Sequence, residues 1–307
     1  MNVILTLLYY TVKMSTPLLF VIMGGVFVQR AGVFNFALES AINTGAFAAI
    51  AVIMVTNNLL AGIIGALLAC VLVNMFFALF TVKFNAHPTV VGMAINLLTA
   101  AIIPYLMMAL FETSAVLNVT QVVDPASVPI DVPILRKIPI LGDIFNKQSP
   151  LTYLSFLAVA VLTLIYYKTD FGKHVRLVGD SREAAEAIGI NVNKIKVLAL
   201  VISGICCALA GLNISVESLG MYTLNLSASR GYICLSAINC GRKEPLKSAA
   251  FGLLFGFARA LQIILANYLG TTLASLLEAL PYITIIVVLV MTEIPNVRRN
   301  PMRIFAK

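Results

Sequence analysis

The sequence predicts an all-α, polytopic membrane protein with about 8–10 transmembrane helices, including re-entrant half-helices. Of its 307 residues, 60% are hydrophobic and 11% are charged, whereas soluble proteins carry roughly 25% charged residues. The charges are clustered, so that residues 40–82 and 84–111 contain none. About 20 apolar residues cross a bilayer as a helix. The apolar runs are continuous rather than alternating, which excludes a transmembrane β-barrel.

Eight apolar stretches are long enough to be read as crossings. They are residues 3–28, 41–56, 58–82, 88–111, 150–167, 197–216, 247–267 and 280–294. Two further stretches, Ala31–Ser40 and Ala228–Cys240, are too short to cross unaided. They suggest half-helices or re-entrant segments, which need other protein to cover their open backbone groups. We therefore treat residues 1–307 as a single transmembrane domain.

Basic residues predict the orientation, because cytoplasmic loops are enriched in Lys and Arg. Six basic residues lie between Lys168 and Lys196, which makes residues 168–196 a cytoplasmic loop. Two smaller groups belong on the same side: Arg242, Lys243 and Lys247, then Arg298, Arg299, Arg303 and Lys307. Residues 112–149 then form an external loop, which prolines such as Pro133 and Pro139 keep extended. Counting the predicted crossings back from the cytoplasmic loop places the N-terminus outside, unless Ala31–Ser40 reverses the chain. The sequence leaves both arrangements open.

The chain lacks the residue patterns of an enzyme or a metal site. No G-x-x-x-x-G-K-[ST] phosphate loop occurs, so any ATP and Mg²⁺ that drive this protein are expected on another chain. The five cysteines lie in apolar stretches without a CxxC pair, which indicates core residues. The net charge of +8 is assigned to cytoplasmic loops rather than to nucleic-acid binding.

The cytoplasmic loop contains a short helix that is stopped at both ends. Asp180-Ser181-Arg182-Glu183 has the pattern of an N-cap with a capping-box partner, and Gly189 suits a left-handed C-terminal residue. An ordinary solvated loop helix would show the same features. A helix held between two membrane spans could also transmit force to a protein bound beneath it.

The spacing of Glu183-Ala184-Ala185 and Gly189 resembles the EAA-type coupling loop of ABC importer permeases, although the downstream Ile-x-Leu-Pro element is absent. The whole chain resembles permease subunits of the simple-sugar and nucleoside branch, which is related to ribose and branched-chain amino acid permeases. The stretches that carry this resemblance are Arg30–Asn35 with Leu38-Glu39, Val91–Leu98, Phe171–Ile190, Ser203–Gly211 with Arg230–Tyr232, and the external Ile138–Gly142 and Gln148–Pro150.

The resemblance implies a multi-pass subunit of the bacterial cytoplasmic membrane, surrounded by lipid, in a binding-protein-dependent importer for nucleosides. Its implied protein partners are an ATP-binding subunit, a second homologous permease and an extracytoplasmic substrate-binding protein. The residues expected to dock the ATP-binding subunit are Asp180, Arg182, Glu183, Ala184, Ala185 and Gly189.

Polar groups inside apolar spans are costly and are candidates for the substrate pathway. Asn35–Ser40 and Asn213–Ser218 share the pattern Asn-x-x-x-Glu-Ser, which suggests a degenerate internal repeat whose two copies face each other near the pathway. The candidate pathway residues are Asn35, Glu39, Asn96, Glu217 and Arg230. Structural alternatives remain open: Asn96 could join helices, Glu39 and Glu217 could pair with Arg30 or Arg230, and Arg259 could pair with Glu278.

Two other classes of transporter remain as alternatives. A ribose, simple-sugar or branched-chain amino acid permease would share the fold but line its cavity differently. An ion-coupled secondary transporter is favoured by the intramembrane Glu39 and Glu217, whereas the capped cytoplasmic helix argues against it.

Overall fold

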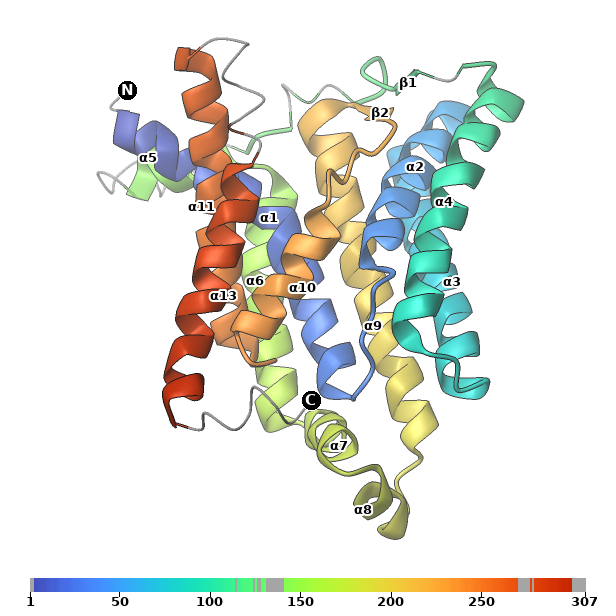
Figure 1. The fold of residues 1–307 in the computed structure, drawn as a ribbon. Helices are drawn as coiled ribbons and strands as arrows, with labels where there is room; N and C mark the ends of the chain where they lie inside the picture. The colour runs from blue at the N-terminus through green and yellow to red at the C-terminus, as the bar shows by residue number, and fades with distance from the viewer. Residues whose placement is uncertain are drawn as a thin grey trace.

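The computed structural model describes residues 3–113, 115–123, 125, 128–130, 141–269, 277 and 279–299, which form a bundle of long helices (Figure 1). Seven of these helices are long and apolar enough to cross a membrane. They are α1 (Val3–Arg30), α2 (Leu38–Thr56), α3 (Leu59–Ala78), α4 (Pro88–Phe111), α6 (Pro150–Lys168), α9 (Val192–Leu212) and α11 (Pro245–Leu269). They match seven of the eight predicted spans. The eighth lies in α13 (Leu280–Arg299), whose apolar part, Leu280–Met291, is shorter.

The course of the chain shows at which end of the bundle α1 begins, which the count of predicted crossings left open. The start of α1 lies at the same end of the bundle as β1 (Val116–Asn118) and β2 (Met221–Thr223), whereas α7 (Asp170–Asp180) and α8 (Arg182–Ala187) project from the opposite end (Figure 1). The first residues therefore share a side with the predicted external loop.

Of the two predicted half-helices, only one forms. Residues 31–37 are non-helical, and α2 begins at Leu38, so Ala31–Ser40 does not form a half-helix, and only the alternative of a non-helical re-entrant segment stays a prediction. Gly32 stops α1 with a positive φ of 82°, a conformation that glycine adopts without penalty. The second half-helix is α10 (Arg230–Cys240), which is too short to span a bilayer.

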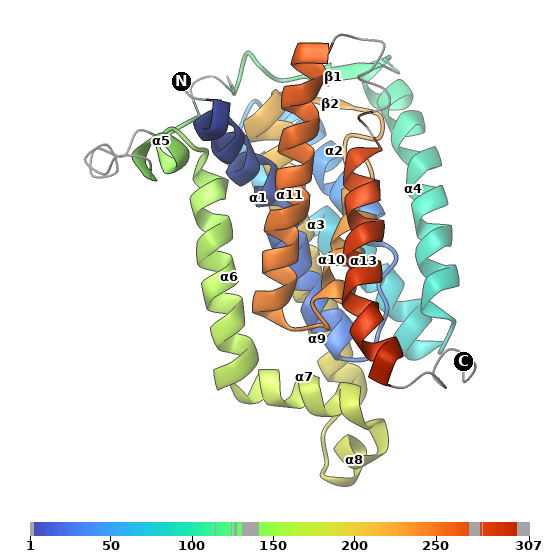
Figure 2. The ribbon, with the colours of Figure 1, turned by 60° about the vertical axis from the view of Figure 1, so that its left-hand side comes forward.

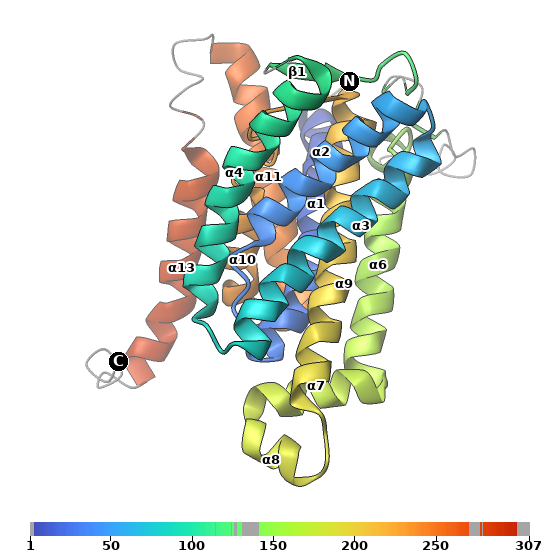
Figure 3. The same ribbon diagram turned by 90° about the vertical axis from the view of Figure 1, so that its right-hand side faces the viewer.

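Helix α1 runs through the middle of the bundle and packs against α11, α9, α6 and α10 (Figure 2). Small residues allow this packing: a Cβ at Gly24 would lie 2.8 Å from the Cβ of Cys206 on α9. Helices α2, α3 and α4 stand together on one side (Figure 3). Large apolar side chains are exposed on α3 and α4, among them Leu68, Leu72 and Tyr105. All five cysteines are buried and none forms a disulfide, as expected of core residues.

The described part of the external segment is more structured than the sequence predicts. Val116–Asn118 pairs antiparallel with Met221–Thr223, and Leu141–Phe145 forms the short helix α5. Several predictions lie outside the described residues. They concern Pro133, Pro139, Ile138–Ile140, Glu278, Arg303 and Lys307.

Candidate functional site

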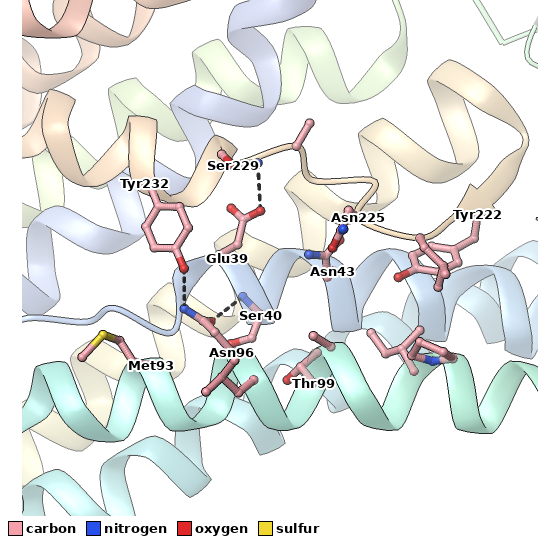
Figure 4. Close-up of a pocket in the computed structure, with 16 residues that line it drawn as sticks. Glu39, Ser40, Asn43, Met93, Asn96, Thr99, Tyr222, Asn225, Ser229 and Tyr232 are labelled. Atoms are coloured by element: carbon pink, nitrogen blue, oxygen red, sulfur yellow. Dashed lines mark hydrogen bonds between the residues drawn. The ribbon is translucent and has the colours of Figure 1, made fainter. Parts of the chain in front are cut away.

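A cavity of about 590 Å³ lies between α2, α4, α10 and the segment 222–229 (Figure 4). Small-molecule sites typically measure about 300–1,000 Å³. Its polar lining residues are Glu39, Ser40, Asn43, Asn96, Thr99, Tyr222, Asn225, Ser229 and Tyr232. Met93, Leu97, Ile103 and Pro104 supply apolar surface. Among the described lining residues Glu39 alone is ionisable near neutral pH, so the cavity offers mostly amides and hydroxyls.

Glu39 lies in the first turn of α2, and its carboxylate reaches the N-terminus of α10. The backbone N–H groups of Ser229 and Gly231 donate to its two oxygens at 2.9 Å and 2.7 Å, and the Ser227 hydroxyl donates to Oε1. Figure 4 shows the contact with Ser229. The first N–H groups of a helix have no partner within the helix, and Glu39 supplies one.

The approach of α10 to Glu39 depends on a glycine. A Cβ at Gly231 would lie 2.5 Å from the backbone nitrogen of Glu39, so any larger residue would separate the two helices. Just before α10, Ala228 and Ser229 have φ values of 43° and 61°. Non-glycine residues rarely adopt this left-handed conformation, and it persists where surrounding contacts enforce it.

Asn96 joins three elements around the cavity. Its Nδ2 donates to the Tyr232 hydroxyl (2.9 Å) and to the Phe36 carbonyl (3.0 Å), and its Oδ1 accepts from the Ser40 N–H (3.1 Å). The structure therefore shows the interhelical role that the sequence left open, at a residue that also lines the cavity.

Two other predicted pathway residues do not line this cavity. Asn35 is buried before the start of α2, and its amide donates to Oδ1 of Asn74 at 3.1 Å. The Arg230 guanidinium donates to the backbone carbonyls of Leu226 and Ser227, each at 3.0 Å.

Glu217 lies at a separate site. It belongs to a π-helical turn, Asn213–Leu219, at the end of α9, and it lines a small cavity of about 30 Å³ with Tyr9 and Lys13. The prediction that the two repeat copies face each other was therefore wrong. Glu217 accepts from the Leu151 N–H (3.1 Å) in the first turn of α6, and from Asn213 Nδ2 (2.9 Å). Each repeat glutamate thus caps the N-terminus of a helix distant in sequence.

Sequence reasoning missed Asn43, Thr99 and Asn225. Asn43 lies four residues after Glu39 on the same helix face, a spacing that could have identified it. Its side chain donates to the Ser227 hydroxyl (2.7 Å) and accepts from the Ser227 N–H (3.1 Å). Asn225 lies in an irregular segment whose position no periodic pattern predicts.

Tyr222 closes one end of the cavity. Burial raises the pKa of its phenol, so the hydroxyl keeps its proton and can donate a hydrogen bond. Its ring packs edge-on against Phe47 with a centroid separation of 5.5 Å.

The short helix predicted in the loop of residues 168–196 forms where it was expected, with a different cap. Ser181 is the N-cap of α8 and accepts from the Ala184 N–H at 3.2 Å. Asp180 instead ends α7 and forms an ion pair with Arg30 (2.9 Å), so the predicted pairing of Arg30 with a repeat glutamate is replaced. Gly189 follows α8 with a φ of 83°, as expected.

Most of the predicted docking residues of α8 face outward. Arg182, Glu183 and Ala184 are exposed, whereas Ala185 is buried against Val178 and Val192. On α7, a hydrogen bond from Lys173 lowers the pKa of Asp170, so its carboxylate stays ionised at neutral pH.

Apolar crossing helices around a polar cavity define a polytopic α-helical transport protein. Residues 7–291 match the family described as branched-chain amino acid transport system / permease component, and the chain belongs to this family. It is thus a permease component of an ABC importer and a multi-pass protein of the bacterial cytoplasmic membrane.

Similar proteins span nearly the full chain. The nucleoside ABC transporter permease protein NupC of Lactococcus lactis is 31% identical, over 94% of this chain and 93% of its own. The guanosine ABC transporter permease protein NupQ of Bacillus subtilis is 30% identical, over 83% and 81%. The structure of PsaBC from Streptococcus pneumoniae in complex with Fab is similar with a TM-score of 0.51 at 12% identity. It covers 91% of this chain and 89% of that chain, and shows a related fold.

Proposed function

We propose that this chain forms the pathway for nucleosides in an ATP-driven, binding-protein-dependent importer. The observation that carries the proposal is the amide- and hydroxyl-lined cavity of about 590 Å³ between α2, α4 and α10. The names of the two relatives at 30–31% identity support nucleosides as the substrate class.

The cavity matches the chemistry of a nucleoside. Amides such as those of Asn43 and Asn225 can both donate to and accept from ribose hydroxyls and base edges. The phenol ring of Tyr232, 6.2 Å from the ring of Phe36, offers an aromatic face to a base. Of the predicted pathway residues, we assign Glu39 and Asn96 to this cavity, and Asn35, Glu217 and Arg230 to supporting positions.

We propose that an ATP-binding subunit, which carries the ATP and Mg²⁺, docks on α8. Exposed Arg182 and Glu183 present charges, and Ile188 presents an apolar side chain that is 67% exposed. A second permease, an external substrate-binding protein and lipid complete the proposed assembly.

The link from α8 to the cavity passes through the end of α1. The Arg30–Asp180 ion pair joins α7 to α1, and Gly179 packs so closely that a Cβ there would clash with the Arg30 carbonyl. Residues 31–37 then lead directly to Glu39. Movement of α8 under ATP-driven closure would therefore shift the start of α2 and alternate access to the cavity.

Uptake by the assembled transporter in proteoliposomes tests the proposal, with nucleosides, ribose and leucine as competing solutes. We expect ATP-dependent uptake that nucleosides alone inhibit. Preferential inhibition by ribose would favour the sugar-permease alternative, which a putative glucose ABC transporter permease of Haloferax volcanii, 26% identical, also represents. ATP-independent uptake by this chain alone would overturn the importer assignment.

A further inference from the structure

The N-terminus of α10 opens toward the cavity, and the carboxylate of Glu39 fills it. We propose that Glu39 sets the charge selectivity of the cavity by occupying this position, so that the cavity admits uncharged solutes and excludes anions. The nature of the admitted solute rests on the proposed function, whereas the exclusion of anions rests on the structure of α10.

A helix N-terminus left open attracts anions. Its free N–H groups and the helix dipole together present roughly half a positive charge. In α10, an 11-residue helix, the N–H groups of Ser229 and Gly231 donate to Glu39, and that of Arg230 donates to the Ser227 carbonyl at 3.0 Å. Three of the N–H groups that an open N-terminus would offer to a phosphate or carboxylate, those of residues 229–231, are thus already engaged.

Further contacts hold the Glu39 carboxylate at the N-terminus of α10. Besides the two backbone contacts, its carboxylate accepts from the Ser227 hydroxyl, and Gly231 leaves no space between the helices. Glu39 also lies in the first turn of α2, where a negative charge interacts favourably with a second helix dipole. An incoming anion would meet a fixed like charge at this wall of the cavity.

The second repeat glutamate supplies a matched control. Glu217 accepts from the N-terminal turn of α6 as Glu39 does from α10, but it lies outside the large cavity. Loss of charge at Glu217 removes a helix cap without exposing a helix N-terminus to the solute.

Ligand-induced shifts in unfolding temperature of the purified full-length chain in detergent test the proposal, because a ligand that binds the folded state stabilises it by mass action. The probes are inosine, inosine monophosphate and inorganic phosphate, at constant ionic strength set with sodium chloride. The proteins are wild type, Glu39→Gln, Glu39→Asp and Glu217→Gln. Gln is nearly isosteric with Glu and keeps one oxygen acceptor, and Asp keeps the charge.

We expect inosine, but neither anion, to stabilise the wild type. In Glu39→Gln, phosphate and inosine monophosphate should bind at least tenfold more tightly than in the wild type, whereas Glu39→Asp and Glu217→Gln should still exclude them. The inference would be overturned if neither phosphate nor inosine monophosphate stabilised Glu39→Gln. Phosphate binding by Glu39→Asp, or phosphate binding by Glu217→Gln as tight as by Glu39→Gln, would overturn it as well. If inosine fails to stabilise the wild type while Glu39→Gln gains phosphate binding, the nucleoside assignment fails and the charge selectivity stands.

Discussion

Replacement of Gly231 by alanine should separate α10 from α2 and open the cavity wall. The added Cβ would lie 2.5 Å from the backbone nitrogen of Glu39, whereas ordinary contact begins at 3.4 Å. The backbones must therefore move apart by about 0.9 Å. The 2.7 Å hydrogen bond from the Gly231 N–H to Glu39 would then lengthen to about 3.6 Å, beyond the limit of a hydrogen bond.

Two effects of the substitution lower the free energy of unfolding, and a third partly offsets them. Overpacking costs about 1–3 kcal/mol, and a lost hydrogen bond to a charged group costs about 1.5–3 kcal/mol. The higher helix propensity of alanine returns about 1 kcal/mol. A net loss of about 1.5–5 kcal/mol corresponds to a decrease in Tm of roughly 3–20 °C at about 2–4 °C per kcal/mol.

A thiol-reactive fluorophore can follow unfolding of the purified chain, because all five cysteines are buried in the folded state. Gly189→Ala is the control: its Cβ meets nothing within 4 Å, and its left-handed φ should cost only about 1–2 kcal/mol. Gly231→Ala should also weaken inosine binding, which Gly189→Ala should leave unchanged. A Tm and an inosine affinity for Gly231→Ala indistinguishable from wild type would refute the close-approach reasoning.

Three further substitutions test other parts of the structure. Glu217→Ala leaves the Leu151 N–H unpaired and should reduce the free energy of unfolding, measured by chemical denaturation, by about 1–3 kcal/mol. An unchanged free energy of unfolding would contradict the role of Glu217 as a helix cap. Asn96→Ala removes three hydrogen bonds and should lower both Tm and inosine affinity, so a variant that loses affinity at normal Tm would show a purely substrate-binding role. Arg182→Glu breaks an exposed pair with Glu186 and should change stability by at most about 0.5 kcal/mol, yet abolish co-purification of the ATP-binding subunit; retained co-purification would place the dock elsewhere.

The membrane-spanning helices could be predicted from sequence because a run of about 20 apolar residues is a sufficient signal. The two short apolar stretches could not be told apart in this way. Ala31–Ser40 and Ala228–Cys240 have similar composition, but Gly32 ends α1 in the first, and the cap from Glu39 allows a helix in the second. That cap joins residues almost 200 positions apart, which no local pattern reveals.

The candidate site was predictable only in part. The cost of burying ionisable and amide groups singled out Glu39 and Asn96 as candidates, and both line the cavity. The shared Asn-x-x-x-Glu-Ser pattern did not show that Glu39 and Glu217 would cap different helices in different cavities. The irregular segment that supplies Asn225 and Ser229 has no periodicity, so only the folded chain places it.

Helix α10 begins about halfway across the bundle (Figure 1). The chain before it, residues 224–229, has no helical hydrogen-bond pattern and includes Asn225, Ala228 and Ser229 in the left-handed conformation. Such backbone rearranges with fewer broken bonds than a helix does. The wall of the cavity on this side is thus irregular backbone, which the contacts of Asn43 and Glu39 with Ser227 hold in place. A change in these few contacts would be enough to reshape this side of the cavity, without the unwinding of a transmembrane helix.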